Sequence, residues 1–134
     1  MSTDRARSEL RRFTRYDEPG ELKQWPAMAL ASIVEPGEGY VLGIDCADRW
    51  LFTDWGTKLV LTNERVVAFT PDPASPMKRA YGLADIEEIR YDSGILAAEM
   101  RLSGADFFES YTVPKRLGRE FFEAVRARSS RNGT

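Results

Sequence analysis

The apolar residues between positions 40 and 113 alternate with polar ones, and this period of two restricts the middle of the chain to β-structure. In the clearest stretch, Ile95 to Leu102, the apolar residues Leu96, Ala98, Met100 and Leu102 alternate with Glu99 and Arg101. Successive side chains of a strand point to opposite faces of a sheet, so this pattern predicts a strand with one buried face. Similar runs predict further short antiparallel strands at 40–44, 49–55, 57–61, 65–70, 78–83, 86–91 and 107–113.

The hydrophobic period changes after Pro114, where the sequence predicts one terminal helix. Leu117, Phe121, Ala124 and Val125 have the spacing that gathers side chains on one stripe of a helix. Such a stripe has to be buried, and the open end of the strand layer is the available place. We therefore expect Phe121 and its neighbours to close a core that is built by the strands.

The two ends of the chain show weaker patterns than the middle. Residues 1–20 are predicted to form a basic arm or short helix, and Pro26 suits the first turn of a further helical segment. Residues 129–134 are predicted to form a disordered tail. The remaining residues, 21–128, then make one domain, as the length of 134 residues suggests.

Three short motifs occur in a fixed order along the strand region. They are EPGE at 35–38, LTNERVVAF at 61–69 and LADIEEI at 83–89. They resemble the PGE lead-in, the LT-x-x-R hairpin and the L-x-D-I-x-x-I segment of bacterial pleckstrin-homology-like (PH-like) domains, including the YokE-like group. The resemblance spans about residues 33–128. It implies a mainly β, α+β fold: a partly open, seven-stranded barrel of two near-orthogonal antiparallel sheets, capped by the C-terminal helix, with extra helical segments at the N-terminus.

The polar residues of these motifs are predicted to hold the fold together. Thr62 and Asn63 can form hydrogen bonds with the backbone of their own turn. Asp85 is expected to accept backbone N–H groups in a short turn. Arg65 is expected to pair with a carboxylate such as Asp85 or Glu64.

The sequence lacks the groups that most enzymes and metal sites use. It contains no histidine, which is the usual proton shuttle at neutral pH and a common metal ligand. Cys46 is the single cysteine, and with Asp45 and Asp48 beside it we interpret it as a small hydrophobic residue. We therefore predict a protein that is not an enzyme and has no catalytic residues, cofactor or metal. The lone thiol and the absence of an apolar leader also predict a cytoplasmic location.

The leading hypothesis for function is a binding or scaffolding module for a protein, a peptide or further copies of the same chain. An exposed sheet edge could accept a partner strand. Trp50 and Trp55 are candidate contact residues, with burial in the core or at its rims as the other interpretation.

The alternative hypothesis rests on charge, because the two arginine-rich ends carry +7 together and leave −9 for the middle of the chain. Arg11 and Arg12 are the candidates for peripheral binding to an anionic membrane lipid or to nucleic acid. Phosphoinositide binding is disfavoured, since the loop after the first long strand holds Asp45 and Asp48 against Arg49 alone.

Overall fold

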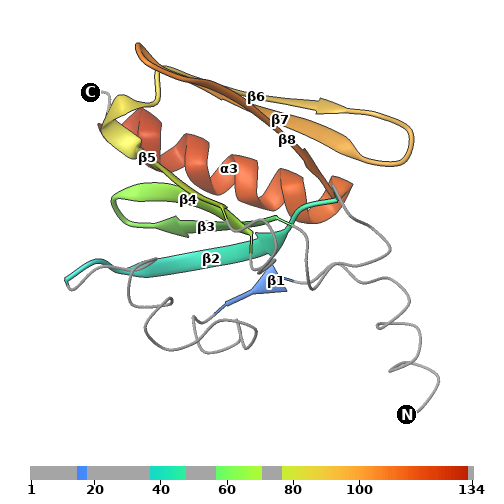
Figure 1. Cartoon of the computed structure of the whole chain (residues 1–134), viewed down its shortest axis with the longest axis horizontal. Coiled ribbons are helices and arrows are strands. Elements are labelled where there is room, and N and C mark those ends of the chain that lie inside the picture. The colour runs from blue at the N-terminus through green and yellow to red at the C-terminus, as the bar shows by residue number, and fades with distance from the viewer. Residues whose placement is uncertain (1–14, 18–36, 48–56, 71–76, 133–134) are drawn as a thin grey trace.

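The structure is a computed structural model, and it describes residues 15–17, 37–47, 57–70 and 77–132 (Figure 1). Several predictions fall outside these residues. They are the N-terminal helical segments, the strand at 49–55 and the four candidate contact residues Arg11, Arg12, Trp50 and Trp55.

Five strands form the first antiparallel sheet, in chain order. They are β1 (Arg15–Tyr16), β2 (Tyr40–Asp45), β3 (Lys58–Thr62), β4 (Arg65–Thr70) and β5 (Met77–Gly82). The β3–β4 hairpin predicted around Asn63 is confirmed, with Leu61 opposite Val66. Both faces of β3 and nearly all of β4 are buried, in keeping with their apolar and β-branched residues. β1 pairs with Gly43 and Ile44 of β2.

Three strands form the second antiparallel sheet. They are β6 (Glu88–Ser93), β7 (Ala98–Ser103) and β8 (Phe108–Val113), and a short 3₁₀ helix, η3 (Leu83–Asp85), connects the two sheets. The alternation predicted for β7 is confirmed at Ala98, Met100 and Leu102, which are buried. The same prediction was wrong for Leu96, which is 94% exposed, because Gly94 N–H donates to the carbonyl of Ala97 and closes the β6–β7 turn before β7 begins.

The long helix α3 (Lys115–Asn132) lies across the space between the two sheets (Figure 1). It contacts β2, β6, β7 and η3. Phe121 and Val125 are fully buried in the main core, and Leu117 and Ala124 pack against it half-buried, which confirms the predicted stripe. The helix extends past Arg128, where the sequence predicted a tail, to Asn132.

The two sheets meet at one corner and stay apart at the other. Ala47 N–H donates to the carbonyl of Thr112 at 2.8 Å, which joins the end of β2 to β8. Among the described residues β5 pairs only with β4, and β6 pairs only with β7. The fold is therefore the partly open, helix-capped arrangement that the sequence predicted, with β5 as a free edge.

The start of α3 packs closely against the end of β8 at Gly118. Alanine normally stabilises a helix relative to glycine by up to about 1 kcal/mol. Here a Cβ at this position would lie 2.8 Å from Val113 Cβ and closer still to its methyl group. We expect Gly118→Ala to lower the free energy of unfolding by about 1–3 kcal/mol, measured by urea denaturation. Glu123→Ala, at an exposed position of the same helix, is the control and should change it little.

Candidate functional site

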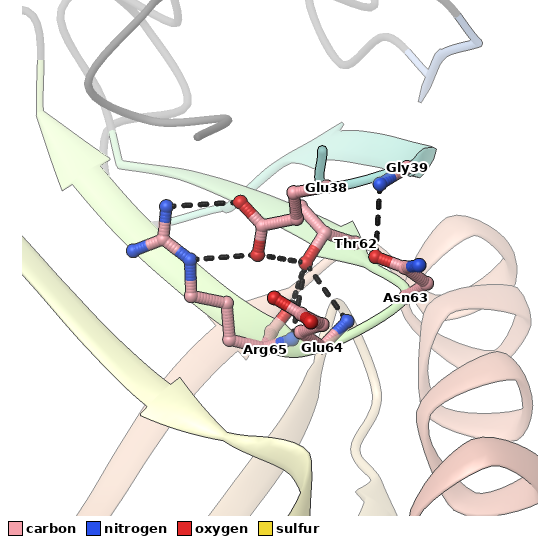
Figure 2. A network of polar contacts seen from close by, with 6 residues as sticks. All are labelled: Glu38, Gly39, Thr62, Asn63, Glu64 and Arg65. Atoms are coloured by element: carbon pink, nitrogen blue, oxygen red, sulfur yellow. Dashed lines mark hydrogen bonds and ion pairs between the residues drawn. The ribbon is translucent and has the colours of Figure 1, made fainter. Parts of the chain in front are cut away.

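A buried carboxylate, Glu38, connects the segment before β2 to the β3–β4 turn (Figure 2). Its side chain is 1% exposed. Arg65 donates to it through both Nε and Nη2, at 2.8 and 3.1 Å, and the Thr62 hydroxyl donates to Oε2 at 2.6 Å. A two-pronged guanidinium–carboxylate contact is among the stronger polar interactions in proteins, and here it compensates for the burial of the acid.

The turn itself is organised by the same side chains. Thr62 Oγ1 accepts the backbone N–H groups of Glu64 and Arg65 at 3.2 and 3.0 Å, which confirms the predicted turn bonds of Thr62. Asn63 bonds outside its turn instead: its Oδ1 accepts the N–H of Gly39 at 2.8 Å (Figure 2).

Arg65 pairs with a carboxylate, as predicted, but the two candidates Asp85 and Glu64 were wrong, because the charge that must be neutralised belongs to the buried Glu38. Both residues belong to motifs that stand out in the sequence: Glu38 ends the EPGE motif, and Arg65 is the arginine of the LT-x-x-R motif. Gly37, at φ +85°, supplies the left-handed backbone just before Glu38. These residues therefore serve the fold.

A second buried ion pair ties β2 to β3 and β1. Lys58 Nζ lies 2.6 Å from Asp45 Oδ1, and the two side chains are 0% and 3% exposed. The Tyr16 hydroxyl donates to the same carboxylate at 2.9 Å. The sequence analysis placed Asp45 in a loop that repels anionic headgroups. This placement was wrong, since Asp45 ends β2 and Lys58 neutralises it.

The expectation that Asp85 caps a turn was also wrong. Asp85 is the last residue of η3, and its carboxylate accepts no backbone N–H from any residue that the structure describes. Its Oδ2 instead lies beside Gly82, 2.8 Å from where a Cβ would be.

A pocket of about 310 Å³ lies where the end of β5 approaches the β7–β8 turn. Its lining includes three acidic residues, Asp85, Glu87 and Asp106, and no basic one. The rings of Tyr81 and Phe107, 4.9 Å apart, form an aromatic wall. The other lining residues are Ala80, Gly82, Ala84 and Ala105. The site could not be predicted from the sequence, because Asp85 and Glu87 of the LADIEEI motif meet the distant Asp106 and Phe107 only in the folded chain.

Side chains of β5 and β8 meet next to this pocket. The hydroxyl groups of Tyr81 and Tyr111 are 2.6 Å apart, and Arg79 forms an ion pair with Glu109. Burial raises the pKa of Tyr111 strongly and that of Tyr81 less. These two tyrosines therefore stay protonated at neutral pH and act as hydrogen-bonding groups of the core rim.

No group of three or more metal-ligating side chains is placed to hold an ion within the described ranges. No helix in that part of the chain has both the length and the apolar character needed to cross a membrane.

No protein-family model matches the chain, and no curated protein matches it. Solved protein structures do match the chain. The N-terminal PH domain of Vps36 has a TM-score of 0.56 at 19% identity, with 73% of this chain and 83% of that chain covered.

Two bacterial proteins are similar to a comparable degree. A DUF1696 family protein with a pleckstrin-homology domain from Shewanella loihica has a TM-score of 0.56 at 15% identity, covering 84% of this chain and 97% of that one. A PH-domain-containing protein from Exiguobacterium sibiricum has a TM-score of 0.58 at 16% identity, covering 88% and 62%. The chain therefore has a PH-like fold, which confirms the fold predicted from the motifs.

The Glu38 network predicts an asymmetry between two acids near one turn. We expect Glu38→Gln to lower the free energy of unfolding by about 2–4 kcal/mol, since it leaves Arg65 partly buried without its counter-charge. Glu64→Gln, at an exposed position of the turn, should change it little. Urea denaturation of both variants is the measurement, and equal losses would contradict the network's role.

The two rim tyrosines predict a loss of stability at high pH. The folded chain keeps protons on Tyr81 and Tyr111 that the unfolded chain releases near pH ~10. Their contribution is therefore complete below about pH 10 and is lost as the pH rises further. Tyrosinate absorbance should show a late-titrating fraction in the folded chain that Tyr111→Phe reduces. A single common titration of all tyrosines would contradict this.

Proposed function

We propose that this PH-like chain is a non-catalytic binding module whose partner is a protein or peptide. The observation that carries the proposal is the edge of β5, which pairs with no second strand among the described residues and ends beside the acidic pocket. A strand edge with unsatisfied backbone groups is a template for an additional strand.

The register shows which backbone groups of β5 face outward. Leu83 N–H donates to the carbonyl of Glu64 at 2.8 Å, and the next pair in the same register is Gly82 opposite Arg65. In an antiparallel ladder, bonded and non-bonded pairs alternate. The N–H and C=O groups of Ala80 and Gly82 therefore point away from β4, towards the free edge.

Two further features support a binding role without chemistry. The lack of histidine removes the commonest acid–base catalyst, and the titratable groups that line the pocket are three carboxylates and the Tyr81 hydroxyl, which is hydrogen-bonded to Tyr111. The buried free thiol of Cys46 suits a reducing compartment, so we place the protein in the cytoplasm. Self-association at the same edge is one form of the proposal.

Peripheral binding to an anionic lipid or to nucleic acid stays the alternative. Its candidate residues, Arg11 and Arg12, lie outside the described residues. Vesicle and DNA binding at two salt concentrations tests it, because such binding weakens steeply with salt.

Selection from a random peptide library displayed on phage tests the leading proposal. We expect the wild-type chain to enrich related peptides, and Ala80→Pro to enrich none of them. Proline removes the outward N–H at residue 80 and leaves the inward bonds to β4 intact. Circular dichroism of Ala80→Pro serves as the folding control.

Two results would count against the proposal. One is a wild-type chain that enriches no peptide and stays monomeric by light scattering. The other is salt-sensitive binding to vesicles or DNA that Arg11→Glu/Arg12→Glu abolishes, which would favour the alternative.

A further inference from the structure

The acidic residues of the pocket carry charge that nothing in the described structure neutralises. Asp85, Glu87 and Asp106 are exposed, and none of their carboxylates forms a hydrogen bond or ion pair with another described residue. By contrast, two buried carboxylates have basic partners: Glu38 pairs with Arg65, and Asp45 with Lys58. The pocket therefore keeps three uncompensated negative charges within one concave space.

The wall of the pocket suits a cation as well. Phe107 is half-buried, and its ring packs against Tyr81. The ring also packs closely against Gly104, where a Cβ would lie 2.7 and 2.9 Å from two of its atoms. An aromatic face fixed in this way attracts an ammonium or guanidinium group, and the carboxylates add charge-assisted hydrogen bonds.

The pocket and the strand edge coincide in position. Ala80 and Gly82, whose backbone groups face outward, both line the pocket. The side chains of a strand alternate between its two faces. In a strand added to β5, every second side chain would therefore lie on the same face as Tyr81 and Phe107. The volume of about 310 Å³ is enough for a single long side chain.

We infer that the partner is an extended segment of another protein that pairs with the β5 edge and places an arginine or lysine side chain in the pocket formed by Asp85, Glu87, Asp106 and Phe107. This inference rests on the proposed function and adds the chemistry of the ligand. The pocket does not suit an anionic lipid headgroup, because its three carboxylates would repel the negative charge.

Two fluorescein-labelled peptides test the inference by fluorescence anisotropy: Thr-Val-Thr-Arg-Thr-Val-Thr and its twin with glutamine in place of arginine. We expect the arginine peptide to bind the wild-type chain at least about tenfold more tightly, since a hydrogen bond to a charged group contributes more than a neutral one. Asp85→Asn/Asp106→Asn should remove this difference.

The control variant is Asp92→Asn/Glu123→Gln, which makes the same change of net charge at exposed positions away from the pocket. It should keep the preference for arginine. Ala80→Pro should weaken both peptides to a similar extent, because it blocks the backbone pairing that they share. Light scattering of each variant reports its oligomeric state.

The outcomes separate this inference from the proposed function. Equal binding of the two peptides, still lost in Ala80→Pro, would overturn the basic side chain and leave peptide binding intact. Arginine-dependent binding that survives Ala80→Pro would overturn the strand pairing. Binding of neither peptide by a chain that enriches others from the phage library would overturn the inference alone. If the wild-type chain is a dimer and Asp85→Asn/Asp106→Asn makes it a monomer, the occupant of the site is a second copy of this chain. That result would overturn the inference that the occupant belongs to another protein.

Discussion

The burial of one helical stripe is the constraint on which the rest of this fold depends. The two sheets are joined by a backbone hydrogen bond between Ala47 and Thr112 at the β2–β8 corner. At the other corner β5 and β6 do not pair, so the core between the sheets needs another cover. Phe121 and Val125 of α3 provide it, and both are fully buried. The same arrangement leaves β5 with one partner strand in the described part of the chain, so the edge that we propose for binding is a consequence of closing the core with a helix.

Two buried ion pairs keep the first sheet rigid where its strands begin and end. Glu38 and Arg65 anchor the β3–β4 turn, and Asp45 and Lys58 link the ends of β2 and β3. A buried pair of this kind adds little net stability, yet removing one partner is costly. We interpret the pairs as devices that fix the register of the sheet, since a shifted strand would leave charges buried alone. A fixed register at β4 then sets which groups of β5 point outward.

The sequence was most informative where periodicity decided the structure. The strands β2 to β8, the turn at Asn63 and the stripe through Phe121 follow from local spacing, and the structure places them close to the predicted residues. The short strand β1 was not predicted, and the strand predicted at 49–55 lies outside the described residues. Pairings between distant segments could not be predicted in this way. Arg65 was expected to pair with a carboxylate such as Asp85 or Glu64, whereas its partner is Glu38, 27 positions away. The pocket was missed for the same reason, because only the fold brings Asp106 close to Asp85.

The distribution of charge adds a final argument about what the fold can bind. A PH-like barrel with a basic pocket would attract anionic headgroups, but the pocket here collects carboxylates, and the middle of the chain carries −9. Asp45 cannot be counted with these repelling charges, since Lys58 neutralises it within the sheet. The three exposed acids Asp85, Glu87 and Asp106 lie beside the edge of β5, whose outward backbone groups follow from the register with β4. Electrostatics and backbone geometry therefore favour the same ligand, an extended and positively charged peptide segment.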